Sequence, residues 1–293
     1  MSENTGVAPL VDRFKRLGSP GRGRGWVDGD PDYVAEYSLT ADHIPALIDL
    51  ATTVLTADSC DPDELYAQVH AWRALAQLRA VEAVQPLLDV QERLDAIGDD
   101  WYLEEFHHVF GMIGPAAIDR LAAFLGNNRQ TQFPRQKAAS GLAEIARRFP
   151  DNRDRVLAVL TGELDLHQEN GDLNGALVMC LLDLQAVEVA ESIERAFAAN
   201  VVDPTFAGDW GDVRRELGVE GLGLAPDVSP GWQTLQERYG MTSAVEKLQA
   251  AQAATIAARL EAQEKRRLNA AKQKARDKRK EQKKSRKRNR RPR

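Results

Sequence analysis

The sequence predicts an all-α protein whose helical hairpins stack into one curved solenoid. Three observations support this fold class. From Thr40 to about Gly218, apolar residues recur with the period of about 3.6 residues that is typical of helices, and no alternating strand pattern occurs. One short apolar segment occurs four times at similar intervals, which indicates internal repeats. Hydrophobic residues make up 43% of the chain, so a sizeable core can form.

The first segment, residues 1–38, is rich in Gly, Pro, Asp and Arg, and it includes Gly21-Arg22-Gly23-Arg24-Gly25. This composition offers too little apolar surface to offset the conformational entropy that is lost when a chain becomes ordered. We therefore expect a disordered leader. The repeated Gly-Arg pair is also found in RNA-contacting segments, but it occurs fewer times here than that function would require.

Helical periodicity begins at Thr40, a suitable N-cap, and predicts a first helix over 41–55. Four hairpins follow. Their first helices end in the recurring segment, at intervals of 35, 32 and 39 residues: Ala74–Leu78, Val109–Ile113, Gly141–Ile145 and Cys180–Leu184. Their second helices are predicted at Val81–Leu94, Pro115–Leu125, Arg153–Leu164 and Val187–Phe197. Pro115 suits a first helical turn, where a missing amide donor costs little.

Small residues accompany the repeats. Gly111, Gly114 and Gly141 would allow paired helices to approach closely. The pattern resembles HEAT repeats, in particular the short HEAT-like repeats of the phycobilisome-lyase type in bacteria, over roughly residues 41–218. The resemblance implies a solenoid over 39–219 in which the helix at 41–55 is the N-terminal cap. Since the repeat fixes few polar residues, it indicates architecture rather than activity.

The end of the repeat region contains Asp203-Pro204 and then Gly208-Asp209-Trp210-Gly211-Asp212-Val213. A short helix over Val213–Leu217 would close the solenoid, with Trp210 either covering the last repeat or stacking on a ligand. Residues 220–242 are predicted to be a linker because of their Gly, Pro and Asp content. Residues 243–293 are predicted to form a long helix that frays into a Lys/Arg-rich tail, disordered after Lys283.

Charge is distributed very unevenly. Residues 265–293 contain seventeen Lys or Arg and two acidic residues, a net charge of +15, whereas the other 264 residues carry −20. Such a block favours polyanions, and without aromatic residues at its end it would bind them with little sequence preference. Alternatives are an anionic membrane surface, a solubilising role, and contact with the chain's own acidic body. The predicted polyanion-binding residues are Lys283, Lys284, Arg286, Lys287, Arg288, Arg290, Arg291 and Arg293.

The densest set of metal-ligand residue types is Asp99-Asp100-Trp101-Tyr102-Leu103-Glu104-Glu105-Phe106-His107-His108. Glu104 and Glu105 each share a helix face with His108, as carboxylates and imidazoles do in di-iron bundles. The chain lacks the matching second pair, and it lacks the His-Glu dipeptides of HEAT-type hydroxylases. We expect the polar residues at the surface, Leu103, Phe106, Val109 and Phe110 in the core, and no metal or other cofactor.

Other catalytic motifs are also missing from the sequence. Ser140-Gly141 lies in a predicted helix, and there is no phosphate loop, Gly-x-Ser-x-Gly elbow or Cys-x-x-Cys. Cys60 and Cys180 are too few for a disulfide scaffold and are expected to be reduced, with Cys180 in the core. The start has no signal-peptide h-region, and no stretch approaches the roughly 20 apolar residues of a membrane span, so a cytoplasmic location is expected.

These observations favour a non-catalytic interaction protein. Its solenoid would bind a partner protein, and its tail would bind RNA, the ribosome or another polyanion. The second helices of such repeats face inward, so the predicted partner-contact residues are Gln85, Asp89, Asp119, Arg120, Glu188 and Glu191. The alternative is a bilin-lyase-like or metal-dependent HEAT enzyme or maturation factor. Metal content after purification, and absorbance above the protein band, would distinguish the two.

Overall fold

The computed structural model describes residues 7–21, 25–55, 60 and 64–219. The chain divides into two units, Met1–Ser229 and Pro230–Arg293, and all described residues lie in the first. Every regular element in these ranges is a helix, which confirms the all-α class for this part of the chain. The predicted linker at 220–242 and tail at 243–293 lie outside the described residues.

Four successive pairs of helices, each called a hairpin below, form most of the described unit. Their first helices are α4 (Ala67–Gln77), α6 (Asp100–Ile113), α8 (Gln132–Arg148) and α10 (Gly171–Asp183). Their second helices are α5 (Val84–Ala96), α7 (Ile118–Leu125), α9 (Arg153–Leu164) and α11 (Ala190–Ala198). Each second helix follows one 3₁₀ turn: η4 (Val81–Ala83), η5 (Pro115–Ala117), η6 (Pro150–Asn152) or η7 (Val187–Val189). The positions of the predicted helices are therefore confirmed, with boundaries that agree to within a turn. Their predicted pairing is clear for α8 and α9, whereas α7 packs against α8 and α9 also packs against α10.

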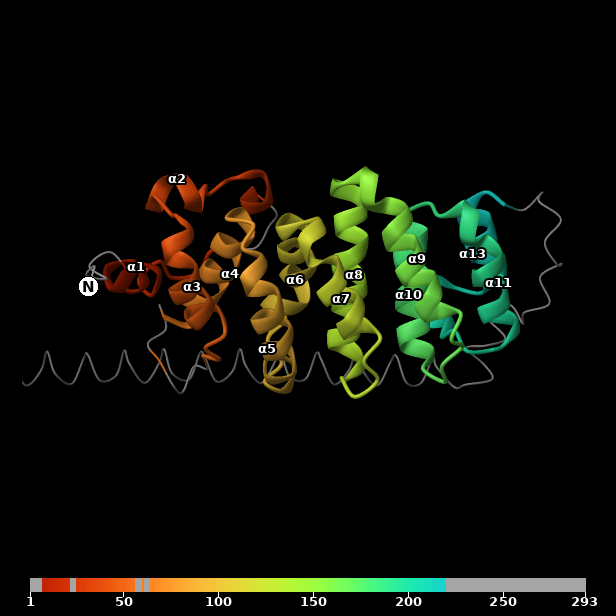
Figure 1. Ribbon diagram of the computed structural model, residues 1–293. Coiled ribbons are helices and arrows are strands. Elements are labelled where there is room, and N and C mark those ends of the chain that lie inside the picture. The colour runs from red at the N-terminus through yellow and green to blue at the C-terminus, as the bar shows by residue number, and fades with distance from the viewer. Residues whose placement is uncertain (1–6, 22–24, 56–59, 61–63, 220–293) are drawn as a thin grey trace, which may run out of the picture. The chain divides into compact units, whose positions relative to one another are not determined.

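In neighbouring hairpins, the first helices contact each other and the second helices contact each other. Among the first helices, α4 contacts α6, α6 contacts α8, and α8 contacts α10. Among the second helices, α5 contacts α7, and α9 contacts both α7 and α11. Figure 1 shows the hairpins following one another in chain order, from α4 in orange to α11 in blue-green. One cluster of buried apolar side chains runs through all of them, so each hairpin buries surface against its neighbours.

A glycine sets the closest approach between two of these first helices. A Cβ atom at Gly141 in α8 would lie 3.0 Å from the Cβ of Phe110 in α6, closer than nearly all real contacts. The predicted role of this glycine in helix packing is confirmed. It allows α6 and α8 to form the most extensive interhelical contact in the described unit.

The prediction of a disordered leader is wrong for the part of it that the structure describes. This segment contains α1 (Val7–Phe14), η1 (Gly25–Asp28) and α2 (Tyr33–Tyr37). Phe14, Trp26 and Tyr33 are each at most 2% exposed, and all three elements contact α4. The segment has few apolar residues, but aromatic rings bury a large area each, and three of them are sufficient to fix it against the first hairpin.

The next elements form the predicted N-terminal helix in a shorter form. It consists of η2 (Ala41–His43) and α3 (Ile44–Ala51), and η3 (Glu64–Tyr66) precedes α4. The amide of Thr40 donates to Nδ1 of His43 at 3.1 Å, which satisfies a donor at the helix start. The helix ends at Ala51, four residues before the predicted end. Thr52 and Thr53 end it by donating their hydroxyls to carbonyls of the last turn.

The last described elements are α12 (Pro204–Ala207) and α13 (Trp210–Leu217). The closing helix begins three residues before its predicted start, because Asp209 caps it by accepting from the amide of Asp212 at 3.0 Å. Trp210 is 4% exposed, and its ring centre lies 6.0 Å from that of Phe197 in α11. The interpretation in which Trp210 covers the last hairpin is therefore confirmed.

Candidate binding pocket

A pocket of about 490 Å³ lies where the first helices of three hairpins end. Residues 27–34 of the N-terminal segment form one wall, including Val27 and Val34. The ends of α4, α6 and α8 and the residues that follow them supply Arg79, Met112, Arg148 and Phe149. The pocket thus depends on the segment that was expected to be a disordered leader.

Gln77, the last residue of α4, fixes this wall. Its Oε1 accepts from the amide of Tyr33 at 2.8 Å. Its Nε2 donates to the carbonyl of Trp26 at 2.8 Å and to that of Pro31 at 3.0 Å. Each hydrogen of the side-chain amide has a backbone acceptor, so one side chain positions three points of the loop. The wall is held by α4 rather than by its own helices.

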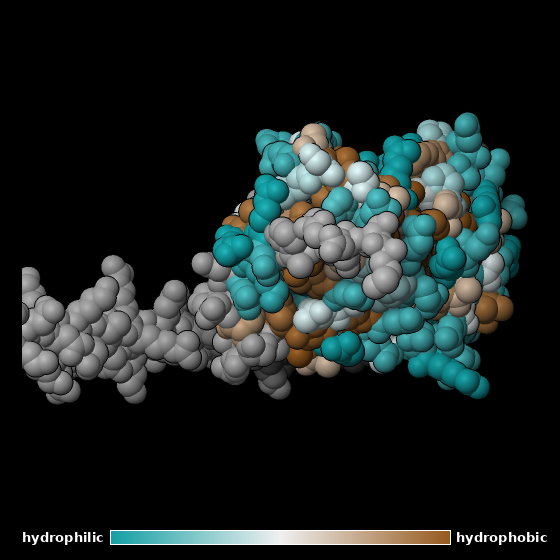
Figure 2. Space-filling view, turned by 60° about the vertical axis from the view of Figure 1, so that its left-hand side comes forward, coloured by the Kyte–Doolittle hydropathy of each residue, from teal (hydrophilic) through white to brown (hydrophobic). Residues whose placement is uncertain are grey.

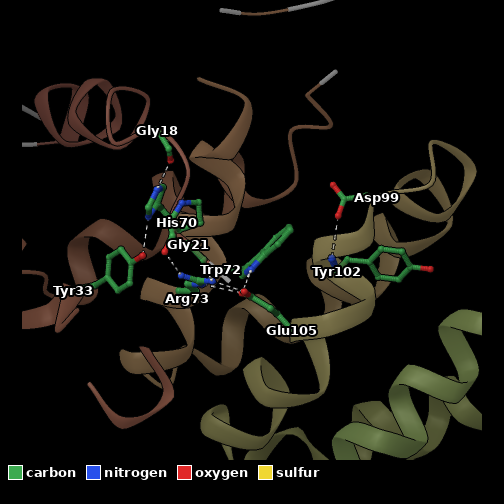
Figure 3. Close-up of polar contacts among 10 residues, drawn as sticks. Gly18, Gly21, Tyr33, His70, Trp72, Arg73, Asp99, Tyr102 and Glu105 are labelled. Atoms are coloured by element: carbon green, nitrogen blue, oxygen red, sulfur yellow. Dashed lines mark hydrogen bonds and ion pairs between the residues drawn. The ribbon is translucent and has the colours of Figure 1, made fainter. Parts of the chain in front are cut away.

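A buried hydrogen-bond chain anchors the same segment deeper in the structure (Figure 3). Tyr33 Oη and His70 Nδ1 are 2.7 Å apart, and His70 Nε2 lies 3.0 Å from the carbonyl of Gly18. A carbonyl only accepts, so Nε2 carries the proton and Nδ1 accepts from the tyrosine. Burial lowers the pKa of His70 to about 4 and raises the pKa of Tyr33 to about 12, so both are neutral near pH 7.

Next to this chain, Arg73 of α4 and Glu105 of α6 form a buried ion pair (Figure 3). Arg73 Nε donates to Glu105 Oε2 at 2.9 Å, and its Nη2 donates to Oε1. Trp72 Nε1 donates to Oε2 at 3.1 Å. The guanidinium also donates to the carbonyls of Pro20 and Gly21, at 3.4 and 3.2 Å. One arginine therefore joins the N-terminal segment to the first two hairpins.

The floor of the pocket is supported by a second buried carboxylate, Glu144 of α8. Its Oε1 accepts from Arg148 Nε at 2.8 Å and lies 3.3 Å from His108 Nδ1. Arg147 forms an ion pair with the other oxygen. A Cβ atom at Gly111 of α6 would overlap Glu144 Cγ, so only glycine leaves room for this carboxylate. Glu144 thereby fixes the stem of Arg148, which lines the pocket.

The polar lining of the pocket is mainly cationic. The guanidinium of Arg79 lies 5.8 Å from the ring centre of Phe149. Burial lowers the pKa of Arg148, an effect that the nearby charge of Asp28 partly opposes. Asp32 also lines the pocket, but its Oδ1 accepts from the amide of Ala35 at 2.9 Å and so caps α2. Two cations and one engaged carboxylate face a pocket in a region of the chain whose net charge is strongly negative.

The six predicted partner-contact residues are all exposed, and none of them lines this pocket. They lie on α5, α7, η7 and α11. The structure pairs Gln85 with Asp89 through an Nε2–Oδ1 hydrogen bond of 2.8 Å. Asp119 forms an ion pair with Arg155, and Glu188 forms one with Arg153, so α9 links these residues to those on its neighbours. The Asp119–Arg155 pair, whose side chains are both largely exposed, is expected to have little effect on stability.

The expected surface position of the Glu/His cluster is wrong for two of its members. Glu105 and His108 are 5% and 7% exposed, and each contacts a charged residue of the neighbouring hairpin, Arg73 or Glu144. These partners compensate the loss of hydration. Phe106, Val109 and Phe110 are buried as predicted, whereas Leu103 is only partly buried and packs against the edge of the core. In the described ranges, no group of three or more His, Cys, Asp and Glu residues is arranged to hold a metal ion.

The other residues singled out by sequence occupy ordinary positions. Ser140 lies in α8 and donates to the carbonyl of Gln136 at 3.0 Å. Cys180 is 5% exposed, and burial raises the pKa of its thiol to about 12, so the predicted core position is confirmed. The eight predicted polyanion-binding residues from Lys283 to Arg293 lie outside the described residues.

Sequence reasoning did not identify the pocket. Its wall comes from a segment with a low apolar content, and its cations stand at the ends of helices, where arginine is common for electrostatic reasons alone. One signal was available. Trp26, Tyr33 and Tyr37 place three aromatic residues within twelve positions of a segment otherwise rich in Gly and Asp. Aromatic residues at that density favour burial.

No protein-family profile matches the chain, and no curated protein or solved structure resembles it to a significant degree. The described part of the chain contains no single helix with the length and apolarity needed to cross a membrane. One pair of segments, Asp100–Ile113 and Pro115–Leu125, reaches these values together but is bent by 106° between its members.

Proposed function

We propose that the chain is a non-catalytic scaffold, built as a HEAT-like α-solenoid, that binds a partner protein and tethers it to a polyanion. The observation that carries the proposal is the charge of the second helices. With their 3₁₀ turns they contain eleven acidic residues and five basic ones, and all six predicted contact residues are exposed. A row of adjacent helices with this excess of carboxylates suits a broad interaction surface rather than a catalytic centre.

The solenoid interpretation is supported by the order of the contacts. Equivalent helices contact each other in sequence, from α4 to α10 and from α5 to α11, as in repeat proteins whose units stack on their neighbours. Figure 2 shows a mostly hydrophilic surface with smaller hydrophobic patches, as expected for helices that bury only one face. Stacking of this kind leaves a long surface free for partners.

The charge balance also indicates which partner suits each part. The 264 residues before the tail carry −20, so a basic protein surface fits the second helices and a phosphate backbone does not. The tail, with +15 in 29 residues, has the opposite preference and suits RNA, the ribosome or another polyanion. A partner bound at the second helices would be brought to the polyanion that the tail contacts.

The experiment that tests this function measures RNA binding across a salt series. The full chain is compared with the 1–264 truncation and with a full-length variant whose eight cationic residues from Lys283 to Arg293 are replaced by Gln. We expect the full chain to bind most tightly, with an affinity that falls steeply with salt as phosphate counterions are released. The Gln variant should bind more weakly and with a shallower salt dependence, and the truncation should not bind. Equal and weak binding by all three proteins would contradict the polyanion role of the tail.

A second arm tests the partner surface. Glu188→Lys and Glu191→Lys on the fourth hairpin reverse two exposed charges without disturbing a buried group. Proximity labelling from the full chain identifies basic partners, and we expect the double variant to lose them while it retains RNA binding. The matched control is Asp183→Lys with Glu216→Lys, which reverses two exposed charges on α10 and α13, outside the second helices. Loss of the same partners from both double variants would show a general charge effect, and retention by both would contradict the proposed surface.

A further inference from the structure

We infer that the pocket at the ends of α4, α6 and α8 binds a small organic anion, with one acidic group attached to an aromatic or branched apolar body. This site is separate from the scaffold surface and the tail, so the inference does not depend on the proposed function. It rests on the positions of two arginines, on the apolar lining between them, and on the buried contacts that hold the walls.

Arg148 supplies the first cation. Glu144 accepts from its Nε, which fixes the direction of the side chain. Among the described residues, the two terminal amino groups of Arg148 have no hydrogen-bond partner, and the side chain is 29% exposed. A guanidinium that is held through Nε presents its remaining donors in a fixed plane, which suits a carboxylate, sulfonate or phosphate oxygen pair. The orientation of the Arg148 guanidinium is therefore fixed before any ligand binds.

Arg79 supplies the second cation from another hairpin. It follows α4, with a φ of +52°, and its guanidinium lies over the ring of Phe149. No ion pair to Arg79 is present among the described residues. Arg79 and Arg148 thus reach the same pocket from helices two hairpins apart, and Phe149 lies beside both. Two guanidiniums at one pocket that also has apolar side chains in its lining favour a ligand that has one anionic end.

The remaining lining determines the other end of the ligand. Val27, Val34, Met112 and Phe149 provide aliphatic, thioether and aromatic contacts. The volume of about 490 Å³ falls within the roughly 300–1,000 Å³ of small-molecule sites. An inorganic anion would leave most of this space unfilled. A purely apolar molecule would leave Arg79 without a counter-charge, and it would offer no acceptor to the terminal amino groups of Arg148, which pairs with Glu144 through Nε alone. An amphiphilic anion satisfies both parts.

Besides Glu144, which pairs with Arg148, two further carboxylates oppose the binding of an anion in this pocket. Asp32 lines the pocket, and Asp28 lies near enough to Arg148 to affect its pKa. Asp32 is engaged as the cap of α2, which directs one of its oxygens to a backbone amide. The acidic group of the ligand is therefore expected on the α8 side of the pocket, between the arginines. Removing the charge of Asp32 is expected to strengthen binding.

The test uses the full-length protein and two fluorescent probes that share one ring system. Anilinonaphthalene sulfonate carries an anionic group, and phenyl-naphthylamine is the same molecule without it. We expect the anionic probe to bind one site at least about tenfold more tightly than the neutral probe, since hydrogen bonds to charged groups contribute that much or more. Equal affinity for the two probes would overturn the inference.

Four variants assign the site. Arg148→Gln and Arg79→Gln are expected to weaken the anionic probe about tenfold each and to leave the neutral probe unchanged. Arg147→Gln is the matched control, because it removes the same charge from the neighbouring position and a contact to the same Glu144, but does not line the pocket. Asp32→Asn retains an N-capping side chain and is expected to tighten the anionic probe.

Each outcome decides between specific possibilities. A loss of affinity in Arg147→Gln equal to that in Arg148→Gln would show that the probe senses general charge, and would overturn the site. If Asp32→Asn binds the anionic probe with the same affinity as the wild-type protein, the proposed placement of the anion is wrong. Circular dichroism and thermal melting of every variant verify that it is folded, and Val34→Trp, which fills the pocket from the N-terminal wall, should abolish binding of both probes.

Discussion

Arg73 and Glu105 lie 32 residues apart in the sequence, and their buried ion pair joins the first helices of two successive hairpins. The same guanidinium holds the carbonyls of Pro20 and Gly21, so the pair also fixes the N-terminal segment that forms one wall of the pocket. A charge pair with side chains 2% and 7% exposed is retained only if nearly every donor and acceptor is satisfied. Trp72 supplies the additional donor.

Replacement of Glu105 by Gln should destabilise the protein by about 3 kcal/mol, because it leaves Arg73 buried without a counter-charge. Chemical denaturation monitored by circular dichroism measures the change. Arg155→Gln, which breaks an ion pair whose side chains are 49% and 85% exposed, is the control and should cost less than about 1 kcal/mol. Similar losses in the two variants would contradict the structural role assigned to the buried pair.

Acidification should destabilise the protein through His70. Its pKa is about 4 in the folded protein and 6.5 in an unfolded chain, so the unfolded state binds the proton first. The contribution of neutral His70 is complete above pH 6.5 and is lost as the pH falls towards 4. At 1.36 kcal/mol for each unit of pKa difference, the loss is about 3 kcal/mol over this window.

The measurement compares the free energy of unfolding at several pH values in wild-type protein and in His70→Gln. Glutamine does not titrate, so the difference between the two should shrink as the pH falls from 6.5 to 4. Other carboxylates titrate in both proteins and cancel in the comparison. A difference that stays constant across the window would show that His70 is not held neutral by burial.

Gly111 gives a packing prediction with an internal control. Alanine at this position would place its methyl group in the space of the Glu144 side chain, and we expect a loss of about 1–3 kcal/mol. At Gly162 in α9 a Cβ meets no atom within 4 Å, so Gly162→Ala should stabilise the protein by about 0.5–1 kcal/mol. Thermal melting separates the two by sign, and equal shifts would contradict the close approach of α6 and α8.

The helices were predictable because their signal is local. A helix shows its apolar face within its own residues, and the recurring segment from Ala74–Leu78 to Cys180–Leu184 lies near the end of each first helix. Residues such as Pro115 indicate where one helix ends and the next begins, and this signal does not depend on any distant contact. The predicted second helix Arg153–Leu164 coincides with α9 for the same reason.

The polar interior and the pocket were not predictable in the same way. Nothing near Glu105 in the sequence indicates that Arg73 will meet it, since such pairing depends on which hairpin faces lie against each other. Gln77 likewise stands at the end of a helix, where a polar residue usually faces solvent. Only the folded structure shows that its side chain donates to the carbonyls of Trp26 and Pro31. The ordered structure of the N-terminal segment was not predicted because its apolar content is low. A few large aromatic rings bury it, in place of the row of aliphatic residues that usually indicates a packed helix.

The stacking of the hairpins predicts how a central defect spreads. Leu142 of α8 is fully buried, and α8 contacts both neighbouring first helices, so Leu142→Asp places an unpaired charge in a core that three hairpins share. A buried charge without a partner costs several kcal/mol, and we expect α6 to α10 to lose protection from hydrogen exchange together. Ala158→Asp, at an exposed position of α9, should leave exchange unchanged. If Leu142→Asp opened α8 alone, the hairpins would not form the continuous core on which the solenoid proposal depends.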